Sequence, residues 1–148
     1  MAADRQDQDG DDSERGSILP LILGVVVFAL VLVLIGAAAT SLYVERKRLF
    51  TLADGAALAG AEAFTMVASD GPRRPVLDSS DVASAATAYL ARADTTALES
   101  LRLERAHSPD GASARVTLSS WWRPPLITAF VPDGIRLEVT AHARTVLR

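Results

Sequence analysis

The sequence predicts an α+β fold in which a long N-terminal transmembrane helix extends into a small C-terminal α/β domain. Residues 18–42 form an uncharged apolar run, small and apolar residues then recur every three or four positions as far as residue 67, and after residue 100 the hydrophobic period changes to two. The first two patterns are typical of a helix and the third of strands. We expect a disordered acidic head at 1–16, a transmembrane helix at 17–44, an extension of the same helix at 45–68 and the small domain at 69–148.

The apolar run is long enough to cross a membrane. As a helix, residues 18–42 would extend ~37 Å at about 1.5 Å per residue, more than the ~30 Å of a hydrocarbon core. Pro20 falls in the predicted first turn, where its missing N–H does no harm, and Tyr43 marks the far interface. The alternative is a cleaved secretory signal, since 37–39 is a run of alanines, but the hydrophobic run is too long and its leading residues are acidic.

The segment that follows the membrane helix carries a face of small residues. Gly55 and Gly60 each cost about 1 kcal/mol relative to alanine inside a helix, a cost usually tolerated where another backbone comes close. Such a face predicts tight helix packing, as between membrane helices. The alternative is that alanine is simply a good helix former in an alanine-rich proteome. The predicted helix-packing face comprises Leu49, Ala53, Ala56, Ala59, Gly60 and Ala63.

The rest of the chain predicts a second helix and about three antiparallel strands. Glycine and prolines mark a loop at 69–80, after which a helix is expected to start with Ser80 or Asp81 as its N-cap and to run to about residue 93. The residues after the first helix can form only a small core, and the extended first helix is therefore expected to cover the sheet. The predicted strands lie around 101–107 and 113–120, as a hairpin, and at 135–147 after a longer crossover.

Composition and motifs exclude several kinds of chemistry. The 148-residue chain has no cysteine, which excludes disulfides and cysteine-bound zinc, and residues 45–148 hold 12 acidic and 13 basic residues, a balance that gives no signal for nucleic acid. His107 and His142 have no third metal ligand at a characteristic spacing, so surface histidines are expected rather than a metal site. No nucleophile, zincin or phosphate-loop motif is present. We therefore expect that the protein is not an enzyme and that it binds no cofactor and no small-molecule substrate.

Three residues stand out as candidate partner contacts. Asp54 is an acid on an otherwise small and apolar helix, for which a solvated carboxylate is the alternative. Trp121 and Trp122 form an aromatic pair that could anchor a partner or the membrane surface. The alternative for the tryptophans is that they cover the open side of a small core.

The stretches "ERGSILPLILG" and "SLYVERKRLFTLADGAALAGA" resemble the amino-terminal region of TadE/TadG-like Flp pilus-assembly proteins over about residues 14–64, closest in outline to TadG-like proteins. The resemblance implies a bacterial, single-pass, pseudopilin-like protein of the cell membrane, with an extracytoplasmic domain that is pilin-like in outline. Its implied role is a structural or accessory component of a Tad-type pilus or related secretion apparatus. Its implied partners are the membrane, other proteins of that apparatus and further copies of itself.

The same resemblance marks Gly16 and Ser17 as a candidate processing site, although Leu21 stands where pilins usually carry a glutamate. Two alternatives stay open. The basic residues flanking the apolar run number two before it and three after it, which by the positive-inside rule favours a cytoplasmic C-terminus, against the resemblance. The chain could also be a membrane-anchored extracytoplasmic binding module unrelated to pili, using its sheet or the tryptophan pair.

Overall fold

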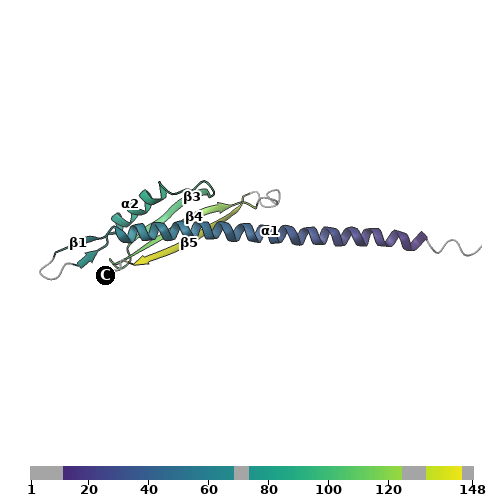
Figure 1. The fold of residues 1–148 in the computed structure, drawn as a ribbon, viewed down its shortest axis with the longest axis horizontal. Helices are drawn as coiled ribbons and strands as arrows, with labels where there is room; N and C mark the ends of the chain where they lie inside the picture. Colours follow the sequence, from purple (N-terminus) through teal and green to yellow (C-terminus); the bar gives the residue numbers. More distant parts are fainter. Residues whose placement is uncertain (1–11, 69–73, 125–132, 145–148) are drawn as a thin grey trace, which may run out of the picture. The chain divides into compact units, whose positions relative to one another are not determined.

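The computed structural model describes residues 12–68, 74–124 and 133–144, with the backbone alone at 12–17 and at 74. The predicted α+β fold is confirmed: a long apolar helix is followed by a second helix and antiparallel strands (Figure 1). The described elements are α1 (Asp12–Glu62), β1 (Thr65–Val67), β2 (Arg74–Val76), α2 (Ser79–Leu90), β3 (Glu99–His107), β4 (Ser113–Trp122) and β5 (Ile135–Arg144).

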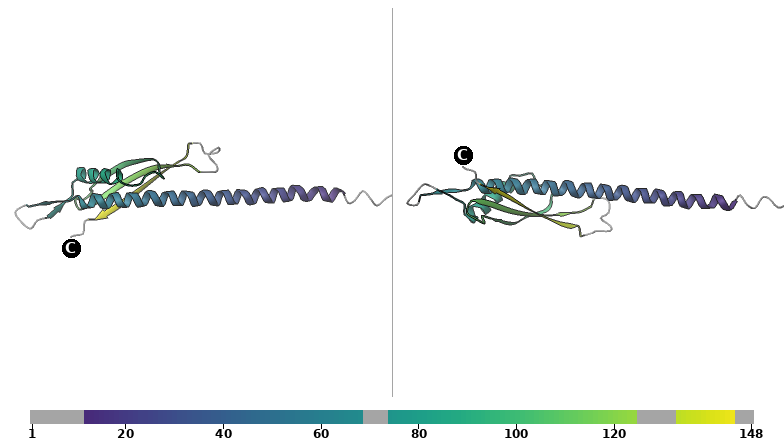
Figure 2. Two further views of the ribbon diagram at one scale, coloured as in Figure 1. Left: turned by 45° about the horizontal axis from the view of Figure 1, so that its top comes forward. Right: turned by 90° about the horizontal axis from the view of Figure 1, so that it is seen from below.

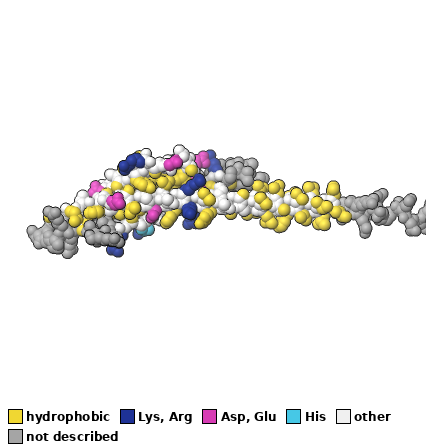
Figure 3. Space-filling view, in the orientation of Figure 1, with side chains coloured by type: hydrophobic (Ala, Val, Ile, Leu, Met, Phe, Trp, Pro, Cys, Tyr) yellow, Lys and Arg dark blue, Asp and Glu magenta, His cyan; other side chains and the backbone are white. Residues whose placement is uncertain are grey.

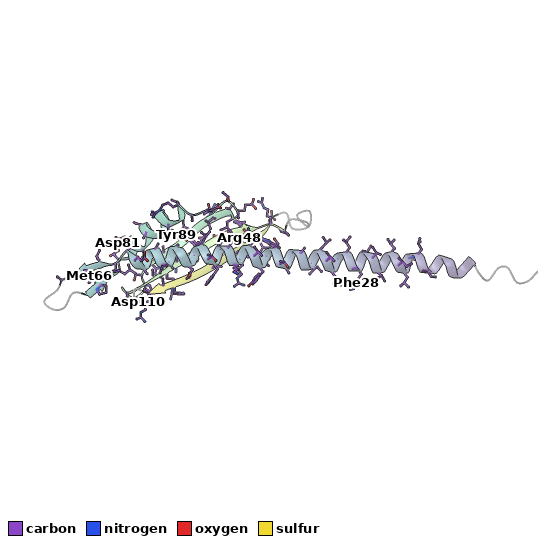
Figure 4. The ribbon with its side chains drawn as sticks, in the orientation of Figure 1. Phe28, Arg48, Met66, Asp81, Tyr89 and Asp110 are labelled. Atoms are coloured by element: carbon purple, nitrogen blue, oxygen red, sulfur yellow. The ribbon has the colours of Figure 1, made fainter. Side chains whose placement is uncertain are left out.

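The N-terminal part of α1 exposes large apolar side chains, such as Leu19 at 75% and Phe28 at 64% (Figures 3 and 4). By length and composition, α1 is the one helix in the described part of the chain that could cross a membrane. The chain divides into two compact units, Met1–Ala39 and Thr40–Arg148. Charged side chains are seen on the second unit (Figure 3).

The ends of α1 differ from the prediction. The helix begins at Asp12, so Pro20 lies inside it and not in its first turn. It ends at Glu62, six residues before the predicted end, because Thr65–Val67 pairs with Arg74–Val76 as a short antiparallel hairpin. Threonine and valine favour strands, and the prediction of a plain extension to 68 overlooked them.

The main sheet has the order β3-β4-β5, with both pairs antiparallel. The predicted hairpin and the predicted final strand are therefore confirmed. β4 runs as far as Trp122, so the two tryptophans end a strand and do not begin the crossover, whose residues 125–132 lie outside the described part. β3 has two register shifts against β4, one between Glu99 and Arg102 and one between Leu103 and Arg105.

One face of the sheet is covered by helices, and we call it the inner face. Within residues 40–148, α1 runs beside the sheet in all three views (Figures 1 and 2). α2 begins at the N-cap Asp78, which accepts a hydrogen bond from Ser80 N, two or three residues before the predicted cap. The expectation that the extended helix covers the sheet is confirmed by a shared core of Leu49, Ala53, Ala56, Ala57, Ala86, Leu98, Val116, Leu118, Val139 and Ala141.

Candidate functional site

The small-residue face of α1 is occupied by the chain's own domain. Leu49, Ala53 and Ala56 are fully buried in the core shared with the sheet and α2. Gly60 is also buried, and Ala59 and Ala63 are half-buried. Whether this face also meets another molecule stays a prediction. In this structure, however, its buried residues are not accessible to a neighbouring helix.

The glycines of α1 explain the closeness of this packing. A Cβ at Gly55 would lie 2.5 Å from Tyr89 Cζ, and Tyr89 of α2 lies next to α1 in Figure 4. A Cβ at Gly60 would lie 3.0 Å from Val82 Cγ1 and 3.3 Å from Ala114 Cβ. Both glycines therefore allow close approach within the chain, and their cost in helix propensity is offset by packing against α2 and β4.

The opposite face of α1 is exposed, and we call it the free face; it comprises Tyr43, Lys47, Phe50, Asp54 and Leu58. These residues recur at spacings of three and four, which places them in one row along the helix. Tyr43, Phe50 and Leu58 are 68%, 51% and 55% exposed. Asp54 is exposed and makes no ion pair within the described residues. A row of large exposed apolar side chains around a lone carboxylate is suited to contact with another helix.

The two tryptophans face opposite sides of the sheet. Trp122 is 7% exposed on the inner face, and its indole N–H donates to Ser41 Oγ of α1 at 3.2 Å. It therefore belongs to the core and links β4 to α1. Trp121 is 37% exposed on the other face, which leaves it as the tryptophan that a partner could reach.

We call the side of the sheet that carries Trp121 the outer sheet face. A β-bulge in β3 brings Glu104 to this face, because bulges re-aim side chains. There Ser119 Oγ donates to Glu104 Oε1 at 2.6 Å, and Arg136 Nη2 lies 2.9 Å from the same oxygen. The sequence gives no signal for a bulge, so sequence reasoning missed this cluster. By strand register, the charged residues and histidines of the outer sheet face are Glu99, Arg102, Glu104, Arg105, His107, Arg115, Arg136, Glu138, His142 and Arg144.

Hydrogen bonding lowers the pKa of four carboxyls in the second unit, and two of them, Glu104 and Asp110, lie on the main sheet or its β3–β4 turn. The Ser119 hydroxyl, followed by the Arg136 charge, holds the pKa of Glu104 below its ordinary value. In the β3–β4 turn, Asp110 accepts from the Ser113 hydroxyl and from the N–H groups of Ala112 and Ser113, which lowers its pKa to about 2. Both groups are therefore ionised at neutral pH.

The histidines lie in one row across the sheet with Arg115 between them, two strands apart and not on adjacent strands. Arg115 Nε donates to His142 Nδ1 at 3.2 Å, and the buried His107 Nδ1 has no hydrogen-bond partner among the residues that the structure describes. Within the described residues, no three His, Cys, Asp or Glu side chains are grouped to hold a metal ion.

The candidate processing site lies within α1. Gly16 and Ser17 have helical backbone, and Pro20 stands four residues after Gly16. Because proline has no N–H, Pro20 cannot donate the helical hydrogen bond to the Gly16 carbonyl. Whether the chain is cleaved there stays a prediction.

Residues 16–63 match the TadE/G-like Flp pilus-assembly family. The match covers about a third of the chain: most of α1 and the residue after it, but neither α2 nor the strands. No curated protein and no solved structure matches the chain. Residues 16–63 thus form a TadE/G-like segment, which includes both the helix-packing face and the free face.

Proposed function

We propose that this chain is a structural or accessory component of a Flp-type pilus or a related secretion apparatus, anchored in the cell membrane by α1. The observation that carries the proposal is the free face of α1, which leaves Tyr43, Phe50 and Leu58 exposed within the TadE/G-like segment. A solvated helix rarely keeps such a row without a partner. Because the small-residue face packs against the chain's own domain, the free face is the surface of α1 that can pack against a neighbouring helix.

The partner we propose is a second copy of the chain, lying parallel to the first. Lys47 and Asp54 stand on the free face seven residues apart, which is ~10 Å along a helix. Two parallel copies shifted by that distance would bring Lys47 of one beside Asp54 of the other, with Phe50 and Leu58 flanking the pair.

A charge exchange tests this pairing. Two differently tagged copies are expressed together, and co-purification from detergent-solubilised membranes is measured. Lys47→Asp and Asp54→Lys should each lower co-purification, because each places like charges together, and the double variant should restore it. Arg92→Asp is the matched control, since Arg92 is an exposed basic residue just after α2. Single variants that co-purify as well as the original chain, or a double variant that does not recover, would contradict the proposed contact.

We further propose that residues 69–148 are extracytoplasmic and that α1 spans the membrane once. The support is the TadE/G-like segment together with the single membrane-capable helix in the described part of the chain. A topology reporter fused after Arg148 tests the orientation: activity on the outer side of the membrane is expected, and cytoplasmic activity would refute it.

A further inference from the structure

The outer sheet face is a second surface that the proposed assembly leaves unused. Both helices pack on the inner face, and the arginines and glutamates of the outer sheet face are exposed. It carries five arginines and three glutamates, an excess of two positive charges. The whole domain is nearly neutral in sequence, so this excess exists only because the fold gathers arginines from three strands on one side.

Most of the arginines of this face make no ion pair within the described residues, although the Glu104 carboxylate attracts Arg102 and the Asp110 carboxylate attracts Arg144. Arg136 lies 2.9 Å from Glu104 and 3.4 Å from Glu138, and Glu99 pairs with Arg123 at 2.7 Å, which accounts for the three glutamates of the face. Arg102, Arg105 and Arg144 make no ion pair with any described residue. The face therefore offers guanidinium groups in successive rows along the sheet, a spacing suited to a linear polyanion rather than to one small anion.

A shallow depression of about 290 Å³ lies at one end of this face, lined by Arg102, Glu104, Ser119, Trp121 and Arg136. Ser119 is only 3% exposed, and its bond to Glu104 holds that carboxylate in place. Trp121 contributes an indole that is 37% exposed. The depression thus combines a flat apolar surface, a fixed acceptor and cationic donors.

The backbone beside the depression is irregular in a way that positions its side chains. Ser100 adopts a φ of 52°, a left-handed conformation that serine rarely takes, and β3 shifts register on both sides of Arg102 and Leu103. Such strain and such bulges concentrate at ligand sites, where they aim side chains.

We propose that the outer sheet face binds an acidic polysaccharide, with one pyranose ring stacked on Trp121 and carboxylates paired with Arg102 and the arginines further along the sheet. The carbon–hydrogen face of a sugar ring packs well on an indole, and arginine pairs with carboxylate through two parallel hydrogen bonds.

The other classes of polyanion fit less well. Single-stranded nucleic acid is bound by aromatic side chains on which successive bases stack, whereas Trp121 is the one Trp, Tyr or Phe on the described outer sheet face. A folded acidic protein would need an apolar centre in its interface, and this face is polar and charged between its arginines.

Binding is measured on the full chain in detergent micelles, with an oligosaccharide of galacturonic acid as the probe. Trp121 and Trp122 are the chain's two tryptophans and Trp122 is buried, so a change in tryptophan fluorescence reports on Trp121. Arg102→Gln should weaken binding about tenfold, through loss of charge-assisted hydrogen bonds. Arg92→Gln, which removes an arginine away from this face, should leave binding unchanged.

Circular dichroism checks that each variant keeps the fold, and an uncharged galactose oligosaccharide and a single-stranded DNA serve as comparison ligands. The inference is supported if the acidic oligosaccharide alone binds well and binding falls in Arg102→Gln. It is overturned if that oligosaccharide does not bind, if the uncharged one or the DNA binds as tightly, or if the Arg102 and Arg92 variants behave alike.

Discussion

Gly60 is the position where the structure makes its sharpest prediction about α1. If the small-residue face served only neighbouring molecules, replacing Gly60 by leucine would leave this chain's own fold intact. In the structure, Gly60 is buried against Val82 of α2 and Ala114 of β4, both of which are fully buried. Gly60→Leu should therefore unfold the C-terminal domain.

The magnitude follows from the space at Gly60. A Cβ there would lie 3.0 Å from Val82 Cγ1 and 3.3 Å from Ala114 Cβ, so even alanine forces these neighbours to move. Overpacking of this kind costs about 1–3 kcal/mol, against a gain of about 1 kcal/mol in helix propensity. Gly60→Ala should then destabilise the domain by ~0–2 kcal/mol. Gly60→Leu adds a whole branched side chain and should cost more than ~3 kcal/mol, a large part of a small domain's stability.

The assay is thermal unfolding of the full chain in micelles, followed by tryptophan fluorescence, because Trp122 lies in the core. At about 4–8 °C per kcal/mol for a domain of this size, Gly60→Leu should lower the midpoint by more than ~12 °C. Gly24→Leu is the control, since a Cβ at Gly24 would meet nothing within 4 Å. A Gly60→Leu variant that unfolds at the original temperature but no longer associates would refute the reasoning and return the face to an intermolecular role.

Three further predictions concern other parts of the second unit. The folded-state pKa of Asp110 is lowered from 3.8 to about 2, so its contribution to stability is present above pH 3.8 and is lost as the pH falls toward 2. In thermal unfolding measured at a series of acid pH values, the midpoint temperature of Asp110→Ala should therefore change less between pH 3.8 and 2 than that of the original chain. Trp122→Phe loses the bond to Ser41 and some core packing, so urea unfolding should show a loss of about 1–3 kcal/mol, and an unchanged urea midpoint would speak against that bond. Phe50→Ser should reduce co-purification of two tagged copies, whereas Met66→Ser, at the same 51% exposure, should not; equal effects would remove the free face as the contact.

The regular parts of the fold could be predicted from the sequence because they follow hydrophobic periodicity. The alternation around Val139 and Ala141 indicated the buried side of β5, and both are buried. What could not be predicted depends on spatial pairing. The strand Thr65–Val67 is too short to show an alternating hydrophobic pattern, and no residue type in the sequence around Glu104 indicates a bulge. The outer sheet face was missed for the same reason, because net charge carries no information on how the strands distribute it.

The small-residue face shows that a correct pattern does not by itself identify the neighbour that covers it. Alanine and glycine at helical spacing indicate only that something comes close to the helix. A chain with a small sheet has a need of its own for such a face, because the sheet must be covered, and Gly55 and Gly60 each lie against a side chain of α2. Residues that meet another copy should instead be large and exposed before assembly, which is the description of Phe50 and Leu58. The two faces of α1 therefore separate two roles, and substitutions on one should disturb folding while substitutions on the other disturb association.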